Sequence, residues 1–136
     1  MSQVKIQCVV AVIVRHGLVL MGKRSPWKVA SPGFWCPISG RIEAGETEQQ
    51  AIVREVAEEV GLRVKPLKKI AEIYTRDETA VLNWWLVETL AGEAYLANNE
   101  HTELRWVPFD QLKQLEPAYP EDIDVLMSVR GSLPGP

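Results

Sequence analysis

The segment from Thr47 to Val60 is the clearest helix prediction in the chain, and it limits how the rest can be arranged. Thr47 with Gln50 three residues later forms a capping box, which marks a helix start. Gly61, directly after the segment, is typical of a helix that ends in a left-handed residue. One face of this helix is apolar, so it is expected to pack against another layer. That face consists of Ile52, Val53, Val56, Ala57 and Val60.

Glutamates crowd the same region, with three of them on one turn of the predicted helix. Carboxylates three or four residues apart repel one another by about a few tenths of a kcal/mol per pair. The crowding therefore indicates a cation among them, and oxygen-only ligands suit Mg²⁺ or Mn²⁺. Ala51 falls on the same arc and is expected to leave room for ions and a phosphate. The glutamates between Gly40 and Leu62 are Glu43, Glu46, Glu48, Glu55, Glu58 and Glu59.

A solvated acidic face is the alternative interpretation of these glutamates, because many surface helices carry one. Arg54 favours the metal site, since it sits beside the glutamates and can orient a carboxylate. Glu46, nine residues before Glu55, can reach the same cluster from the preceding loop.

The remainder of the chain mixes strand and helix patterns. Residues 6–14 are almost wholly apolar and β-branched, which predicts a central strand buried on both faces. Lys23–Phe34 carries prolines and a glycine and is expected to be a loop, and residues 131–136 a flexible tail. Further strands are predicted over 18–21, within 35–42, and over 64–74, 80–89 and 104–107, with helices over 109–115 and from Pro120. We expect one domain over residues 1–136, with its core at about 4–130, of the α/β (α+β) class: a mixed sheet packed between helices.

Composition excludes some classes of partner. The net charge is −3 and no block of basic residues occurs, so binding to a nucleic acid polymer is not expected. The longest apolar run, Cys8–Val14, is too short to span a bilayer, and no signal peptide is recognisable. Cys8 and Cys36 lack metal-site spacing and are interpreted as reduced core thiols. A cytoplasmic protein, monomeric or homodimeric, is expected.

The glutamate-rich segment resembles the Nudix box, whose pattern is G-x5-E-x7-R-E-U-x-E-E-x-G-U, with U a bulky aliphatic residue. All nine fixed positions match over 23 residues: Gly40, Glu46, Arg54, Glu55, Val56, Glu58, Glu59, Gly61 and Leu62. Weaker similarity covers roughly residues 6 to 127, including Trp35 before the box and a late strand at Glu103–Val107. One departure is Ile38-Ser39-Gly40, where the family commonly has Pro-Gly-Gly.

The resemblance implies an α/β/α sandwich and a Mg²⁺-dependent hydrolase of nucleoside diphosphate derivatives, with Mn²⁺ as a possible substitute. It implies that Glu55, Glu58 and Glu59 bind the metal, together with the backbone carbonyl of Ser39. Arg54 would orient a glutamate. The proton of the attacking water would go to one of these glutamates or to a late one, for which Glu103 is the first choice and Glu100 the alternative.

Residues outside the box choose the substrate. The run Asn83–Glu88 resembles a MutT strand whose aromatic residue faces the base, which favours cleavage of a nucleoside triphosphate to monophosphate and pyrophosphate. Alternatives are ADP-ribose, a nucleotide sugar, a dinucleoside polyphosphate, or a non-catalytic nucleotide sensor. Trp84 and Trp85 point to opposite faces of a strand, so one can stack on a base, or both can pack. The predicted substrate contacts are Arg24, Trp84, Trp85 and Tyr119, whereas His16 and His101 are expected in a turn and at the surface.

Overall fold

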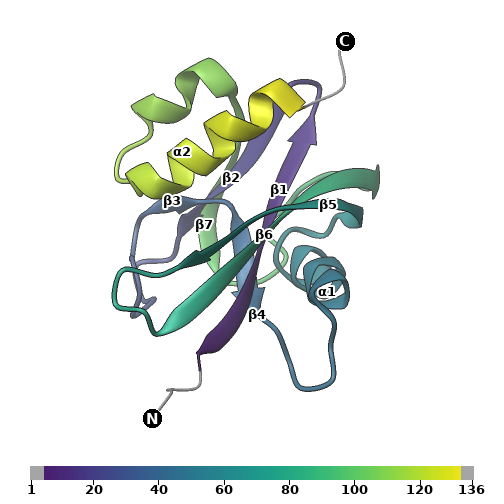
Figure 1. Cartoon of the computed structure of the whole chain (residues 1–136). Helices are drawn as coiled ribbons and strands as arrows, with labels where there is room; N and C mark the ends of the chain where they lie inside the picture. The colour runs from purple at the N-terminus through teal and green to yellow at the C-terminus, as the bar shows by residue number, and fades with distance from the viewer. Residues whose placement is uncertain (1–4, 133–136) are drawn as a thin grey trace.

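The computed structural model describes residues 5–132, which form a seven-stranded mixed sheet between helical layers (Figure 1). The strands are β1 (Ile6–Arg15), β2 (Leu18–Arg24), β3 (Trp35–Cys36), β4 (Ile38–Arg41), β5 (Arg63–Tyr74), β6 (Ala80–Ala91) and β7 (His101–Pro108). The helical segments are α1 (Glu48–Val60), α2 (Pro120–Val129) and two 3₁₀ helices, η1 (Phe109–Gln114) and η2 (Arg130–Ser132). The strand order is β3-β2-β1-β6-β5, with β4 paired to β1 and β7 paired to β2.

Strand β1 is the centre of this sheet. It pairs in parallel with β6 and antiparallel with β4 and β2. Residues Val9–Ile13 are all buried, so both faces of the strand are covered. Each buried aliphatic side chain of this size contributes roughly 1.5–3 kcal/mol relative to an exposed one. The prediction of a central strand buried on both faces is confirmed.

The alternation of side chains along β1 divides the core in two. Val10 and Val12 pack with Leu112 and Leu126, on the face covered by η1 and α2. Val9, Ala11 and Ile13 pack with the apolar residues of α1 on the opposite face. The sheet therefore lies between α1 on one side and η1 with α2 on the other, as Figure 1 shows, and the predicted α/β/α sandwich is confirmed.

Helix α1 begins and ends as predicted. The Thr47 hydroxyl accepts from the Gln50 N–H at 3.1 Å, and the Gln50 side chain accepts from the Thr47 N–H at 2.9 Å. Gly61 follows the helix with a φ of 71°. The predicted apolar face, however, is wrong in part, since Val53 and Ala57 are exposed.

The buried face of α1 is rotated toward the glutamates. Its buried residues are Ala51, Ile52, Val56, Glu59 and Val60. Ala51 is fully buried and packs in the core, so the expectation that it leaves room for ions is wrong. A helical wheel shows which residues share a side, but the position of the sheet decides which side is buried.

The segment between β6 and β7 runs along the end of α1. The Tyr95 N–H donates to the Val60 carbonyl at 3.1 Å, and the Ala97 N–H donates to the Glu59 carbonyl at 3.1 Å. These bonds satisfy carbonyls that a helix end leaves without partners. They also bring Glu100 and His101 to the C-terminal turn of α1.

Several boundaries differ from the prediction. The late strand begins at His101 rather than Leu104, because His101 pairs with Arg24 across a register shift. Cys36 is buried and Cys8 half-buried, and both thiols are free. Of the predicted tail, Gly131 and Ser132 belong to η2, whereas 133–136, like 1–4, lie outside the described residues. Within 5–132, no helix has the length and apolar character needed to cross a membrane.

We expect Gly61→Ala to lower the free energy of unfolding by more than Gly17→Ala does. Both glycines have positive φ, of 71° and 75°, where a Cβ costs about 1–2 kcal/mol. A Cβ on Gly61 would also lie 2.1 Å from the Tyr95 ring, whereas one on Gly17 would meet nothing within 4 Å. Urea unfolding of both variants measures the difference, which should shrink in a Tyr95→Ala background. Equal losses would show that Tyr95 moves aside freely.

Candidate active site

Arg54 is the centre of the acidic cluster. Its Nε and one terminal nitrogen donate to the two carboxylate oxygens of Glu46 at 2.7 and 2.9 Å. The other terminal nitrogen donates to Glu55 at 2.6 Å and to Glu58 at 3.3 Å. A further bond, to the Arg41 carbonyl at 2.9 Å, ties the guanidinium to the end of β4. Arg54 therefore holds three carboxylates in fixed positions relative to the sheet.

Glu46 is ionised as a result of this contact. The hydrogen bond from Arg54, followed by the bond from the Glu43 backbone N–H, lowers the pKa of Glu46 to about 2. The same bond to Glu46 raises the pKa of Arg54 above its already high ordinary value. The loop before α1 is thereby fastened to the helix by a charged pair across the whole neutral pH range.

Gly40 makes room for Glu55. A Cβ on Gly40 would lie 2.1 to 2.5 Å from the three atoms of the Glu55 carboxyl group, so the carboxyl rests directly on the β4 backbone. Ser39 precedes it in β4, opposite Val10 of β1, and both residues have the extended backbone of a strand. Serine therefore causes no strain there, and it directly precedes the residue that Glu55 rests on.

Glu59 is buried beside Glu55. It is 3% exposed, and among the described residues its Oε2 has no hydrogen-bond partner. Burial first, and then the Glu55 carboxyl beside it, raises the pKa of Glu59 to about 10. Glu59 is therefore protonated at neutral pH in the absence of a cation.

His101 lies against Glu59 and is a core residue, so its predicted place at the surface is wrong. It is 5% exposed, and its Nδ1 lies 3.8 Å from Glu59 Oε1. Burial, followed by Arg24, lowers the pKa of His101 to about 4, which keeps the imidazole neutral. No sequence pattern marks this residue, because its burial depends on the glycine at position 22 of the neighbouring strand.

The structure brings Glu100, rather than Glu103, to the cluster. Glu100 pairs with Lys28, and its charge contributes to the raised pKa of Glu59. Glu103 is about half exposed and pairs with Arg105 at 2.9 Å. Arg105 stacks over Trp35, which belongs to the core on the α2 side, and Glu103 shares its side of β7. Glu103, the first choice for the late glutamate, therefore faces the α2 side of the sheet, whereas Glu100, the alternative, lies near the cluster.

The two tryptophans of β6 point to opposite faces, as predicted. Trp84 is 1% exposed and packs in the core beneath α2, so it has no open face for a base. Trp85 packs toward α1, where its Nε1 donates to Glu48 at 2.8 Å. The Trp84 ring is therefore a core residue, whereas the half-buried Trp85 ring is fixed by its bond to Glu48.

Arg24 and Tyr119 lie on the loop side of the molecule. Arg24 ends β2, and its Nε donates to the Ala30 carbonyl at 2.9 Å. The Tyr119 ring packs on Phe34 with centroids 4.8 Å apart, and its hydroxyl bonds to Ser31. Both residues are half-buried, so part of each side chain is open to a ligand.

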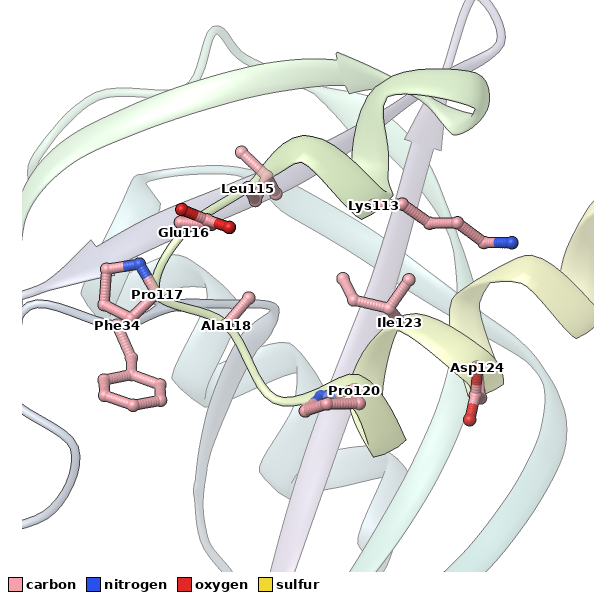
Figure 2. Close-up of a pocket in the computed structure, with 9 residues that line it drawn as sticks. All are labelled: Phe34, Lys113, Leu115, Glu116, Pro117, Ala118, Pro120, Ile123 and Asp124. Atoms are coloured by element: carbon pink, nitrogen blue, oxygen red, sulfur yellow. The ribbon is translucent and has the colours of Figure 1, made fainter.

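A cavity of about 770 Å³ adjoins Tyr119 on the α2 side of the sheet. Figure 2 shows Phe34 and the residues of η1, the following connection and α2 around it. Leu115, Ala118 and Ile123 form its apolar part, with Lys113 and Asp124 among its polar residues. None of the box glutamates lines it, so the cavity is separate from the acidic cluster.

The acidic cluster fits a hard divalent cation in its chemistry. Glu55, Glu58 and Glu59 supply carboxylate oxygens, and the buried Oε2 of Glu59 lacks a partner that a cation would provide. Within residues 5–132 no three acidic, histidine or cysteine side chains already converge as a closed metal site. Glu55 and Glu58 are instead held by Arg54, so they would have to turn toward an arriving cation.

Comparison with known proteins matches the chain to one family. A family model described as "NUDIX domain" matches residues 5–129. The chain is 28% identical over 110 residues to the NAD-capped RNA hydrolase NudC of Escherichia coli, covering 81% of this chain and 42% of NudC. The chain thus spans less than half of this curated relative.

Solved structures share the fold. The E. coli ORF135 protein superposes with a TM-score of 0.73 at 26% identity, covering 97% of this chain and 95% of that one. The MutT NUDIX hydrolase from Burkholderia pseudomallei gives a TM-score of 0.79 at 24% identity, covering 93% and 99%. At this identity, the second similarity speaks for the fold alone.

We expect the metal-free protein to lose stability as the pH rises from 7 to 9, and Glu59→Gln to reduce that loss. Above about pH 4.5 the unfolded chain ionises Glu59, whereas the folded chain keeps its proton until about pH 10. The free energy of unfolding therefore falls as the pH rises, by at most about 1.4 kcal/mol per pH unit.

Urea unfolding in EDTA at both pH values measures this change, and the difference between wild type and Glu59→Gln isolates Glu59 from other groups. His101 interferes little, because the unfolded chain, with a histidine pKa near 6.5, binds only a fraction of a proton there at pH 7, and the folded chain, with a pKa of about 4, binds none. Parallel pH profiles for the two proteins would contradict a protonated Glu59.

Proposed function

The chain belongs to the NUDIX domain family, and from that membership we propose that it is a Mg²⁺-dependent hydrolase of a nucleoside triphosphate. The bond broken is a phosphoanhydride, and the products are a nucleoside monophosphate and pyrophosphate. The observation that carries the hydrolase proposal is the arrangement of Glu55 and Glu59 beside Gly40, with Arg54 holding the neighbouring carboxylates.

The metal would be held by Glu55, Glu58 and Glu59, with the Ser39 carbonyl next to them. A bound Mg²⁺ neutralises phosphate oxygens and makes a water ligand more acidic. Arg54 holds Glu46 in place, and through its bond to Glu55 it fixes the position from which that carboxylate turns toward the cation, so it does not need to touch the substrate. Its role is that of an orienting group whose own charge never changes.

Glu100 is the proposed acceptor of the proton from the attacking water. It reaches the cluster from outside α1, and it is held there by Lys28. A general base must lie within hydrogen-bond reach of the proton it removes. The pairing of Glu103 with Arg105, which stacks over Trp35 on the α2 side, favours Glu100 over Glu103 for this role.

The triphosphate assignment rests on residues outside the box. A proline about fifteen residues past Leu62 would resemble ADP-ribose pyrophosphatases, but Asp77 stands there and closes a turn through bonds with Thr75 and Thr79. Arg24 and Tyr119 are kept as proposed substrate contacts because both are partly open. Trp84 is left out because it is fully buried, whereas the half-buried Trp85 stays a proposed contact on the α1 side, where Glu48 holds its Nε1.

A second candidate is a substrate in which a pyrophosphate joins two nucleosides, as in NAD. The similarity to the NAD-capped RNA hydrolase NudC favours it. The third alternative, a sensor that binds a nucleotide without hydrolysis, would not require the intact set of box residues.

Incubation with Mg²⁺ and a panel of nucleotides should release pyrophosphate and monophosphate from at least one triphosphate. Chromatography resolves pyrophosphate from orthophosphate and from the two monophosphates that NAD would yield. Cleavage of NAD alone would replace the triphosphate assignment by the second candidate. Binding without turnover of any panel member would favour the sensor.

In the same assay Glu58→Gln should lower kcat by orders of magnitude, because it removes a proposed metal ligand. Glu58 is about half exposed, so the fold should be retained. Glu48→Gln on the same helix is the control, since the amide oxygen can still accept from Trp85. Normal activity of Glu58→Gln would remove the metal assignment.

Glu100→Gln should lower kcat by about 10²–10⁴-fold, the usual contribution of a general base, whereas Glu103→Gln should leave it nearly unchanged. The two glutamates are three residues apart, and both pair with a cation, so they form a matched pair. Steady-state kinetics at saturating Mg²⁺ compares them. A larger loss in Glu103→Gln would reverse the assignment.

A further inference from the structure

His101 and Glu59 form a buried polar pair that the proposed chemistry does not yet use. The two side chains are 4% and 3% exposed, and 3.8 Å separates His101 Nδ1 from Glu59 Oε1. Within the described residues, neither His101 Nδ1 nor Glu59 Oε2 has a hydrogen-bond partner. Buried polar atoms without partners cost stability, so an apolar residue at position 101 would serve the core better.

The surroundings hold the imidazole in place. A Cβ on Gly22 would lie 2.5 Å from the His101 ring, so this glycine of β2 admits the ring. Ser25, which is fully buried, fixes the backbone just before His101. Its N–H donates to the Glu100 carbonyl at 3.0 Å, and its hydroxyl donates to the Asn99 carbonyl at 2.6 Å. The ring therefore keeps its place against Glu59.

We infer that His101 is a positioning residue, whose Nδ1–H donates to Glu59 Oε1 and aims Oε2 at the metal. This inference rests on the proposed metal site. Closing the distance from 3.8 Å to that of an ordinary hydrogen bond requires a shift of about 1 Å, within the rotation of a glutamate side chain.

A neutral donor suits this task better than a cation. An arginine or lysine beside Glu59 would orient the carboxylate but would also repel the divalent ion and weaken its binding. An imidazole N–H orients one oxygen and leaves the negative charge for the metal, as partners of metal ligands do elsewhere. Arg54, by contrast, contacts Glu46, Glu55 and Glu58, which lie farther toward solvent.

Mn²⁺ binding, followed by electron paramagnetic resonance without substrate, tests the inference. His101→Leu should weaken Mn²⁺ binding by about 10- to 100-fold, the usual effect of removing such a partner. His101→Asn, whose amide nitrogen can occupy the place of Nδ1, should restore most of it. The melting temperature of metal-free His101→Leu should not fall below that of His101→Asn, because leucine leaves no buried polar atom.

Wild-type affinity in His101→Leu would overturn the inference and leave the metal site intact. Equal weakening in the leucine and asparagine variants would also overturn it, since shape rather than the donor would then matter. No Mn²⁺ binding by the wild type would instead overturn the proposed function.

A spectroscopic measurement on the wild type covers the case in which His101→Leu fails to fold. The chain has two histidines, so His16→Gln leaves a single imidazole for ¹⁵N resonance assignment. With Mg²⁺ added, the His101 proton should reside on Nδ1 and exchange slowly with water. A proton on Nε2 alone in the Mg²⁺-loaded protein would contradict the inference.

Discussion

Side-chain alternation along β1 is the constraint on which the two halves of this molecule depend. Val10 and Val12 face one helical layer and Val9, Ala11 and Ile13 face the other, so a single strand serves both cores. A slip of one residue would exchange the two sets. Because β1 pairs with both β4 and β6, its register also decides where Ser39 and Gly40 lie, and hence what Glu55 rests on.

The acidic cluster is a balance between packing and charge. Arg54 donates hydrogen bonds to three carboxylates that are at least partly exposed. Glu59 instead lies in the core, where burial and the neighbouring Glu55 carboxyl keep it protonated. Neighbouring glutamates of α1 thus differ: Glu55 and Glu58 accept from the Arg54 guanidinium, whereas Glu59 has no cationic partner among the described residues. A divalent ion would unite them, and this is why the surplus of negative charge in the sequence points to a metal.

Local patterns in the sequence were sufficient for most of the fold. The capping box of Thr47, the stop at Gly61 and the apolar run of β1 each act over a few residues, so they can be read without the structure. The burial of Ala51 and the exposure of Val53 could not be predicted from the sequence, because they depend on where the sheet lies against the helix.

The places of the site residues depend on the same arrangement. Sequence spacing does not separate Glu103 from Glu100, but a register shift at Lys23 and Arg24 places the two differently. Trp84 and Trp85 were correctly assigned to opposite faces, yet alternation alone does not tell which face is open. His101 carries no local signal at all.

The segment between β6 and β7 has a consequence for how such a site can vary. The Ala97 N–H donates to the Glu59 carbonyl of α1, and Ser25 holds the end of the segment, its hydroxyl donating to the Asn99 carbonyl and its N–H to the Glu100 carbonyl. The backbone of Glu100 is therefore held both by main-chain bonds and by the side chains of Ser25 and Asn98. A site of this kind can therefore vary along the segment only where its length and the bonds of Ser25 and Asn98 are kept.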